Sequence, residues 1–536
     1  MSDSVQGNRA AARDAGGDPY DRLPYESRPF PDMQPDRLSA LAVLHGLEPA
    51  EVVRGRVLEL GCASGGNIVP LAARFPDASF IGIDLSARHV ADGQARIREL
   101  GLPNIELRQG DIAACDWLAG RFDTIICHGV YSWVPPFVQD AILRIIGRHL
   151  ASTGVACVSY NTLPGWHLRQ IARDIFQYRT RALATAPQQI AEGLALLNEL
   201  AEASDATRPY GQALRAEARL LAETSPSYVM GEHLAPACTP CYFHEFVDRA
   251  SARGLAFLCE ARPAHGLPEE QHREFTRRAR AQAGDDPIAF EQYMDLFLGR
   301  QFRRTLLVSA ERAHRISRTP APERLAGLHL ATTLTLDLDA SSYGKLVFQH
   351  PDGRTFAPGD ADACRAIELL VSIAPRTQTP EAICAAVVSA GSQDRTEREA
   401  RVLDALLDMI EADFVTVSAS AVRAGDATPQ RPCAWPLARS DAAAACAWTT
   451  SLAHRIVTLD GPARWLLPQL DGQADRAMLA RRLMAALATG EVAWADGAAT
   501  DRPALLMSEA VAMVDRLVAF CADNALLEPA QPDANA

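Results

Sequence analysis

The sequence predicts an α/β fold with a doubly wound, mainly parallel sheet, in a chain of several domains. Short apolar runs alternate with amphipathic helical segments between residues 56 and 161, the pattern of right-handed βαβ crossovers. The apolar runs are nearly continuous, so both faces of the sheet should be covered. At 536 residues, the chain is also longer than one hydrophobic core usually supports.

Each predicted strand of the sheet corresponds to one short apolar run in the sequence. Two later segments, 242–261 and 291–309, each combine a helix with a strand, and the strand FLCEA (257–261) could rejoin the sheet. The five runs that we predict as strands of the first part are RVLELG (56–61), FIGIDLS (80–86), IELRQGD (105–111), FDTIICHG (122–129) and VACVSYN (155–161).

Composition shifts divide the chain into seven parts. The helical text after residue 168 is too long for one crossover, so we expect an inserted subdomain that could serve dimerisation or regulation. The last two modules read as small α+β units of winged-helix type. The predicted parts are a disordered N-terminus (1–18), a cofactor-binding domain (19–167), a helical insertion (168–240), the end of the sheet (241–315), a middle module (316–416), a linker (417–440) and a C-terminal module (441–536).

Charge and composition exclude several classes of protein. The formal net charge of -13 leaves no basic footprint for nucleic acid, so we expect no nucleic-acid partner. We also expect no membrane span and no signal peptide, since no apolar run approaches the ~20 residues that a span needs. The 12 cysteines are spread along a long chain, which favours reduced thiols over a disulfide framework. We therefore predict a cytoplasmic protein.

A cluster of histidines and cysteines in HLAPACTPCYFH needs a separate decision. His233, Cys238, Cys241 and His244 superficially suit zinc. The ligands lack a second pair at a knuckle spacing, and prolines stiffen the path between them. We predict no metal site there.

The motif VLELGCASGG indicates a nucleotide-like site at the end of the first strand. Its glycines permit positive φ and let the backbone approach a ligand at the start of the next helix. Asp84 ends the second strand, where a carboxylate can accept ribose hydroxyls, and Asp111 ends the third, where it could take an adenine amino group. The full predicted cofactor-binding set is Tyr25, Glu59, Gly61, Gly65, Asn67, Asp84, Leu85, Asp111, Ile112 and His128.

The acids decide between two cofactors. Glu59 beside the glycine loop would repel the diphosphate of NAD, whereas the sulfonium and ammonium groups of S-adenosylmethionine would be favoured there. We therefore predict S-adenosylmethionine. The alternative is that Asp84 and Asp111 are only helix N-caps, and an NAD enzyme stays a minor alternative.

Residues 56 to 160 resemble the class I, Rossmann-like methyltransferases. More narrowly, YDRLPYES, VLELGCASGGN, HGVYSWVP, SYNTLPGW and YFHEF resemble bacterial methyltransferases with an attached methyltransferase regulatory domain, among them the rickettsial lysine methyltransferases of outer-membrane proteins. The resemblance implies that Tyr25 and the aromatic lead after it lie near the cofactor. Ala63 departs from the glycine that is usual at the middle of the first motif.

Aromatic turns follow the fourth and fifth strands, where ligands bind in such sheets. We predict that Tyr131, Trp133, Tyr160, Asn161 and Trp166 frame the methyl acceptor. Burial among these rings, next to a cationic sulfonium, would lower the pKa of an acceptor lysine. The alternative is that the aromatics only cover the sheet end.

The histidines receive different predictions. His128 could cap the cofactor, and His128 and His167 are the candidates for a general base. His45 and His454 stand alone in apolar helical text and are expected to be structural.

Three functions stay open at this point. The first is a methyltransferase acting on a protein, most plausibly on lysine. The second is a small-molecule N- or O-methyltransferase. The third is a non-catalytic protein that senses S-adenosylmethionine.

Overall fold

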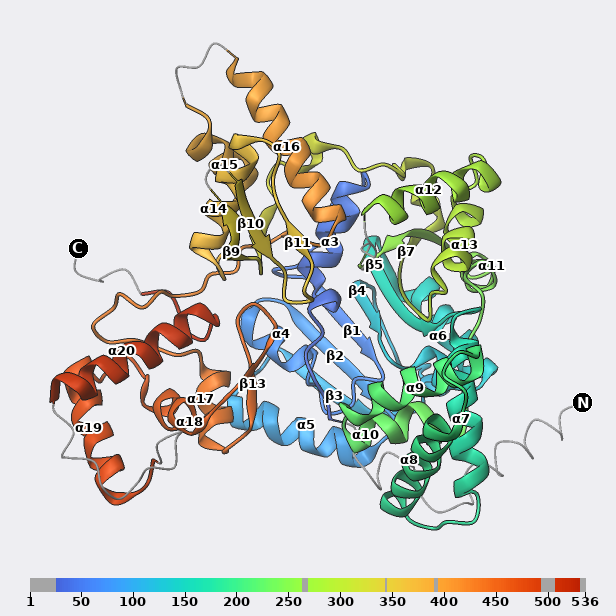
Figure 1. The fold of residues 1–536 in the computed structure, drawn as a ribbon, viewed down its shortest axis with the longest axis horizontal. Coiled ribbons are helices and arrows are strands. Elements are labelled where there is room, and N and C mark those ends of the chain that lie inside the picture. The colour runs from blue at the N-terminus through green and yellow to red at the C-terminus, as the bar shows by residue number, and fades with distance from the viewer. Residues whose placement is uncertain (1–25, 263–268, 343–344, 390–393, 493–506, 531–536) are drawn as a thin grey trace, which may run out of the picture.

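The chain folds around one seven-stranded sheet with two further modules attached (Figure 1). The computed structural model describes residues 26–262, 269–342, 345–389, 394–492 and 507–530. The strand order is β3-β2-β1-β4-β5-β7-β6, with β1 to β5 parallel and β7 antiparallel to both neighbours. The predicted doubly wound fold is confirmed. The strands are β1 (Arg56–Leu60), β2 (Ser79–Asp84), β3 (Ile105–Gln109), β4 (Phe122–Cys127), β5 (Leu150–Asn161), β6 (Leu255–Glu260) and β7 (Phe302–Ser309).

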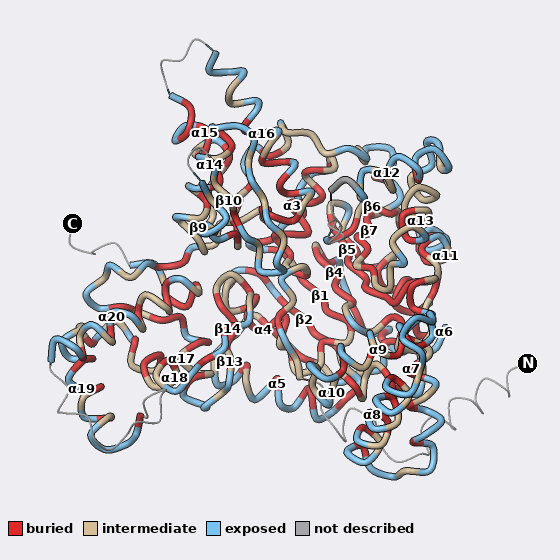
Figure 2. Tube along the Cα trace, viewed as in Figure 1, coloured by how far each residue is buried: buried red, intermediate tan, exposed pale blue. Residues whose placement is uncertain are grey.

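Helices cover both faces of the sheet, so alternate strand residues enter different cores. Val57 packs in the core that includes α3, α4 and α5, whereas Leu58 packs in the core with α6 and α11. Figure 2 shows the strands buried along most of their length. These helices are α3 (Pro35–Leu44), α4 (Ile68–Arg74), α5 (Ala87–Leu100), α6 (Pro136–His149) and α11 (Phe243–Ser251).

A helical segment lies between β5 and β6. Its core includes Phe176, Leu197 and Leu214, which are fully buried between the helices. The insertion consists of α7 (Trp166–Thr180), α8 (Ala186–Ala203), α9 (Pro209–Ala222), α10 (Pro226–Val229) and the π-helix η4 (Met230–Leu234). Further on, α12 (Glu269–Ala283) and α13 (Pro287–Leu298) precede β7.

The middle module follows the sheet through η5 (Ala310–Arg315) and η6 (Pro322–Leu325). It pairs β8 with β12, and it pairs β10 with β9 on one side and β11 on the other, all antiparallel. Its elements are β8 (His329–Thr332), β9 (Thr335–Ser342), β10 (Lys345–Gln349), β11 (Thr355–Phe356), α14 (Ala361–Ile373), α15 (Pro380–Val387), α16 (Arg395–Glu411) and β12 (Val415–Ser418).

The C-terminal module places a short hairpin among helices. The hydrophobic core around α3, α4 and α5 continues into this module and the middle one, so the three parts share buried contacts. Its elements are α17 (Pro436–Ala443), β13 (Trp448–Thr450), β14 (Ile456–Thr458), α18 (Gly461–Leu466), η7 (Leu467–Gln469), α19 (Arg476–Thr489) and α20 (Met507–Asp523). No helix in the described ranges combines the length and apolarity needed to cross a membrane.

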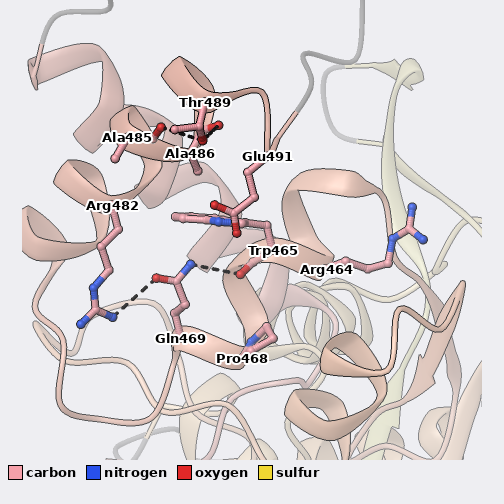
Figure 3. Close-up of a pocket in the computed structure, with 9 residues that line it drawn as sticks. All are labelled: Arg464, Trp465, Pro468, Gln469, Arg482, Ala485, Ala486, Thr489 and Glu491. Atoms are coloured by element: carbon pink, nitrogen blue, oxygen red, sulfur yellow. Dashed lines mark hydrogen bonds between the residues drawn. The ribbon is translucent and has the colours of Figure 1, made fainter.

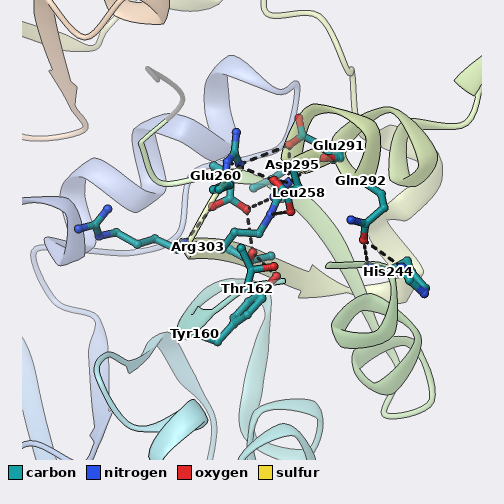
Figure 4. A network of polar contacts seen from close by, with 12 residues as sticks. Tyr160, Thr162, His244, Leu258, Glu260, Glu291, Gln292, Asp295 and Arg303 are labelled. Atoms are coloured by element: carbon teal, nitrogen blue, oxygen red, sulfur yellow. Dashed lines mark hydrogen bonds and ion pairs between the residues drawn. The ribbon is translucent and has the colours of Figure 1, made fainter. Parts of the chain in front are cut away.

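A buried arginine joins the last two strands of the sheet to α13 (Figure 4). The guanidinium of Arg303 donates to Glu260 at 2.7 Å, to Asp295 at 2.8 Å and to Glu291 at 2.9 Å, and its side chain has no exposed surface. Thr305 donates to the same Glu260 carboxylate at 2.7 Å. Arg303, Glu260 and Asp295 are buried, and burying charged groups is costly unless they stay paired, so the stability of this edge of the sheet depends on these pairs.

We expect Arg303→Met to destabilise the protein by about 3 to 5 kcal/mol, because it leaves Glu260 buried without its cation and leaves Asp295 paired with Arg300 alone. Denaturant unfolding followed by circular dichroism measures the change. The control is Arg277→Met on α12, whose partner Glu274 is at the surface and whose loss should change the free energy of unfolding little. Equal effects of the two changes would contradict the structural role of the cluster.

Candidate active site

The glycine loop after β1 turns sharply because three of its residues have positive φ. Gly61 and Gly65 have φ of 76° and 80°, and a Cβ at Gly61 would lie 2.2 Å from Val130 Cγ2. Ala63, at φ 47°, adopts the same left-handed region, which explains why glycine is usual there. Its N–H donates to Asp84 Oδ2 at 2.8 Å. The carboxylate at the end of β2 therefore holds the loop in shape.

The predicted adenosine-side residues lie at the carboxyl ends of β2 and β3. Asp84 accepts from Ser86 N–H as well, at 2.9 Å, but the cap of α5 is Ser86 itself. Asp111 is exposed and caps the short helix η2 (Ile112–Ala114) by accepting from Ala113 N–H at 2.8 Å. Leu85 is 61% exposed and Ile112 is buried. Simple capping therefore describes Asp111 but not Asp84.

Glu59 is a buried acid one residue before the end of β1. Its Oε1 accepts from Asn67 Nδ2 at 2.9 Å, while its Oε2 is buried without a hydrogen-bond partner among the described residues. Desolvation raises the pKa of Glu59 to about 8, and the negative charge of Asp84 adds to the effect. The protein thus keeps a carboxyl oxygen available beside the glycine loop.

The N-terminal lead covers this loop from outside. Ser27 Oγ accepts from Gly66 N–H at 2.7 Å, and Phe30 N–H donates to Asn67 Oδ1 at 3.1 Å. A Cβ at Gly66 would lie 2.3 Å from Ser27 O, so only glycine lets the two backbones approach this closely. Tyr25 lies outside the described residues.

These residues fit the cofactor that the sequence predicts. An ammonium group beside Glu59 would supply the missing partner of Oε2 and the positive charge that a buried carboxylate needs. Asp84 stands at the strand end where an acid can accept ribose hydroxyls.

His128 follows β4 and lies between two phenylalanines. Its ring centroid is 4.1 Å from that of Phe30 and 6.0 Å from that of Phe302. Burial, together with the nearby Arg304, lowers the pKa of His128 to about 3, so the ring is neutral at physiological pH. Its Nδ1 is buried without a partner among the described residues.

Two of the predicted acceptor residues, Tyr131 and Tyr160, are packed in the hydrophobic core beneath the sheet end. Tyr160 stacks on Phe246 at 4.1 Å and its hydroxyl bonds to Thr305 Oγ1 at 3.0 Å, next to the Arg303 cluster (Figure 4). Tyr131 packs edge-on against the same Phe246 and is fully buried. The two phenols are therefore packed among core side chains, and their contact with an acceptor stays a prediction.

The other three residues form a second group of aromatic and polar side chains. The rings of Trp133 and Trp166 meet edge to face with their centroids 5.8 Å apart. The guanidinium carbon of Arg173 lies 5.8 Å from the ring centroid of Trp133. Asn161 Nδ2 and Trp166 Nε1 are buried, and the acceptor near both of them is the thiol of Cys238. Burial raises the pKa of this thiol, and Arg173 and the two N–H groups lower it in part. Sulfur is a weak acceptor, so a bound group with a stronger acceptor atom would satisfy these donors better.

Some contacts of the site were not predicted. His454 lies in the turn between β13 and β14, not in a helix, and its Nε2 is 2.9 Å from Asn67 Oδ1. The prediction of helical text around His454 is therefore wrong. His45 does have a structural contact, with Ser317 O at 2.8 Å.

The histidine and cysteine cluster separates in space. His233 packs against Glu217 at 3.1 Å, whereas His244 bonds to Gln292. Within the parts of the chain that the structure describes, no group of three or more His, Cys, Asp or Glu side chains could hold a metal ion.

Two cavities lie away from the glycine loop. One of about 550 Å³ lies in the C-terminal module between α18, η7 and α19, with Trp465, Arg464 and Arg482 in its wall (Figure 3). The other, of about 150 Å³, lies beside Tyr131 and Arg249. Tyr131 is the one predicted site residue among those that line them.

The unpartnered oxygen of Glu59 generates a test that uses S-adenosylhomocysteine as the probe. At pH 7, most Glu59 is protonated because its pKa is about 8, and pairing with an ammonium group requires the carboxylate. Binding should therefore release close to one proton, on the order of 0.9 at pH 7, and affinity should rise with pH from about 6 to 8. Calorimetry in buffers of different ionisation enthalpy measures this number.

Glu59→Gln should abolish the proton release and weaken binding by about tenfold or more. The control is Glu106→Gln, an exposed acid on β3, which should behave as the wild type. Proton release that persists in Glu59→Gln would assign the titrating group elsewhere.

Three family models match the chain in succession. A methyltransferase domain matches residues 57–154, a predicted methyltransferase regulatory domain matches 225–309, and a PKMT C-terminal winged-helix domain matches 430–526. The regulatory match contains β6 and β7, so this region completes the sheet. The predicted winged-helix character of the C-terminal module is confirmed.

Relatives occur in rickettsiae. The Rickettsia prowazekii (strain Madrid E) protein RP789 is 38% identical over 294 residues, which is 55% of this chain and 53% of that protein. The match thus spans about half of its length. RP028 of the same organism is 33% identical over 240 residues, 45% of this chain and 96% of that protein.

A solved structure has the same fold. The structure of PKMT2 from Rickettsia typhi in complex with AdoHcy aligns with a TM-score of 0.81 at 24% identity, covering 94% of this chain and 100% of that one. The chain belongs to the same family as RP028, and it combines the methyltransferase, methyltransferase regulatory and PKMT-type winged-helix domains of a class I, S-adenosylmethionine-dependent methyltransferase.

Proposed function

We propose that the protein transfers a methyl group from S-adenosylmethionine to the side-chain amine of a lysine in a protein. The match of residues 430–526 to a PKMT winged-helix domain carries the choice of a protein acceptor. The fold shared with PKMT2 over all domains is consistent with it.

The cofactor side is formed by four parts of the chain. Glu59 binds the ammonium group, Asp84 binds the ribose, and the lead from Ser27 to Phe30 covers the glycine loop. Tyr25, Asn67, Leu85, Asp111, Ile112 and His128 complete the proposed set. When bound, S-adenosylmethionine supplies a methyl group on a positively charged sulfur.

The acceptor side needs alignment more than covalent help. A new N–CH3 bond forms as the S–CH3 bond breaks in line, and the bonding electrons return to sulfur. Orientation in a dry site can contribute as much as about 7 to 11 kcal/mol when the geometry is ideal. In our proposal Trp133 and Trp166 orient the lysine, and the Asn161 amide oxygen accepts an N–H of the neutral amine.

The lysine must lose a proton before the transfer. Because the ordinary pKa of lysine is near 10.4, its deprotonation at neutral pH costs about 4 to 5 kcal/mol. Burial beside the sulfonium and near Arg173, whose charge lies close to Trp133, would lower that pKa. His128, with a pKa of about 3, is a weak base, so the proton leaves to water as the lysine enters the site.

The direct test separates protein from small-molecule acceptors. Purified protein is incubated with methyl-labelled S-adenosylmethionine and host lysate, and label is counted in the protein and the small-molecule fractions. Label on lysine in a discrete protein band supports the proposal. Label confined to small molecules overturns the protein acceptor, and cofactor binding without any transfer favours a sensor.

The two sides of the site should respond differently to substitution. Asp84→Ala removes the ribose acceptor and the bond to Ala63 N–H, so we expect S-adenosylhomocysteine to bind at least about tenfold more weakly. Asn161→Ala should leave this affinity within about twofold and lower turnover by about tenfold or more. Calorimetry and single-turnover labelling measure the two quantities.

A matched control is Asn104→Ala, whose amide bonds only to backbone carbonyls around α4. This change should lower the stability of the protein, but it should not affect cofactor affinity and turnover differently. Equal loss of affinity in the Asp84 and Asn161 variants would show that the acceptor side is assigned wrongly.

A further inference from the structure

The C-terminal module reaches the cofactor side through its hairpin. The turn between β13 and β14 carries His454 at φ 58° and contacts Asn67, the residue before α4 (Figure 1). The side chain is 2% exposed, and its Nε2 is 2.9 Å from the Oδ1 of Asn67, the residue that precedes α4. The two residues are 387 positions apart in the sequence.

The direction of this hydrogen bond follows from the neighbours of Asn67. Phe30 N–H can only donate, so the atom of Asn67 that it meets at 3.1 Å is the oxygen. The other amide atom is then the nitrogen, which donates to Glu59 Oε1 at 2.9 Å. His454 Nε2 must therefore carry a proton and donate to Asn67 Oδ1.

The contacts form a chain from the C-terminal module to the cofactor-binding acid. His454 and Phe30 together fix the amide of Asn67, and this amide fixes one oxygen of Glu59. The other oxygen, Oε2, is left beside the glycine loop without a partner in the described structure. The hydrogen bonds from His454 to Asn67 and from Asn67 to Glu59 are both buried, so water does not compete with them and they are stronger.

The hairpin is held in place by other contacts as well. Trp448 Nε1 donates to Glu26 at 2.7 Å, and Thr449 Oγ1 donates to Asp441 at 2.6 Å. Arg96 on α5 pairs with the same Asp441. Loss of the His454 imidazole should therefore leave the C-terminal module docked.

We propose that His454 is a positioning residue for the cofactor: through Asn67 it orients the carboxylate of Glu59, so that docking of the C-terminal module sets cofactor affinity. This inference rests on the proposed use of S-adenosylmethionine. It adds that the cofactor site is complete only when a residue of the winged-helix domain is in place.

The test measures the affinity of the full chain for S-adenosylhomocysteine by calorimetry. His454→Asn suits the left-handed backbone, so the chain should fold, but its amide is too short to reach Asn67. We expect the Kd to rise by about tenfold. His454→Gln places an N–H donor near the position of Nε2 and should restore the Kd to within about twofold of the wild type. A purely structural role of the imidazole would not give this rescue.

A double-mutant cycle identifies the route. If His454 acts through Asn67, the double variant His454→Asn with Asn67→Ala should bind no more weakly than Asn67→Ala alone. The matched control is Ile456→Thr on the same hairpin, a 41% exposed side chain whose change should leave the Kd unaltered.

The outcomes distinguish this inference from the proposed function. Suppose that the wild-type protein binds S-adenosylhomocysteine. An unchanged Kd in His454→Asn, or additive losses of affinity in the double-mutant cycle, then overturns the positioning role but not the proposed function. Absence of binding to the wild-type protein overturns the proposed function and this inference with it. Weakened binding, rescue by glutamine and a non-additive cycle support both.

Discussion

The proposed cofactor side depends on one buried hydrogen bond, between Asn67 and Glu59. A carboxyl group near the end of a central strand is costly to bury, and desolvation accordingly raises the pKa of Glu59 to about 8. The Asn67 amide satisfies one oxygen, so the second is the only place where the remaining cost can be offset by a ligand charge. The glycine loop, the lead and the C-terminal hairpin are all arranged around this pair.

The Arg303 cluster is a second buried polar contact that holds the structure together, at the edge of the sheet formed by β7 and β6. β7 runs antiparallel between β5 and β6, and the charges of Glu260, Asp295 and Glu291 converge on one guanidinium there. Tyr160 joins this cluster through Thr305. The region that matches the regulatory domain is therefore part of the same folding unit as the cofactor site. A change in the packing of that region would therefore alter the position of β5, whose last residue is Asn161.

The first five strands could be predicted from the sequence because each is a short apolar run bounded by turn residues. The packing of Tyr160 in the core was not predicted, because Tyr160 and Asn161 were expected to face one acceptor. Side chains alternate along a strand, so adjacent residues point to opposite faces, and the tyrosine enters the core with Phe246. His454 could not be found in this way. Its partner is 387 residues away, and no local pattern encodes a contact between modules.

The placement of His454 has a consequence for regulation. Phe30 N–H and His454 Nε2 donate to the same oxygen, so the N-terminal lead and the C-terminal module are linked through one atom of Asn67. Thermodynamic coupling is reciprocal: if docking of the hairpin strengthens cofactor binding, the bound cofactor must strengthen docking by the same factor. A protein that engages the winged-helix domain would then alter cofactor affinity without touching the cofactor. In this arrangement the winged-helix domain, whose match supports a protein acceptor, would also complete the cofactor site through His454.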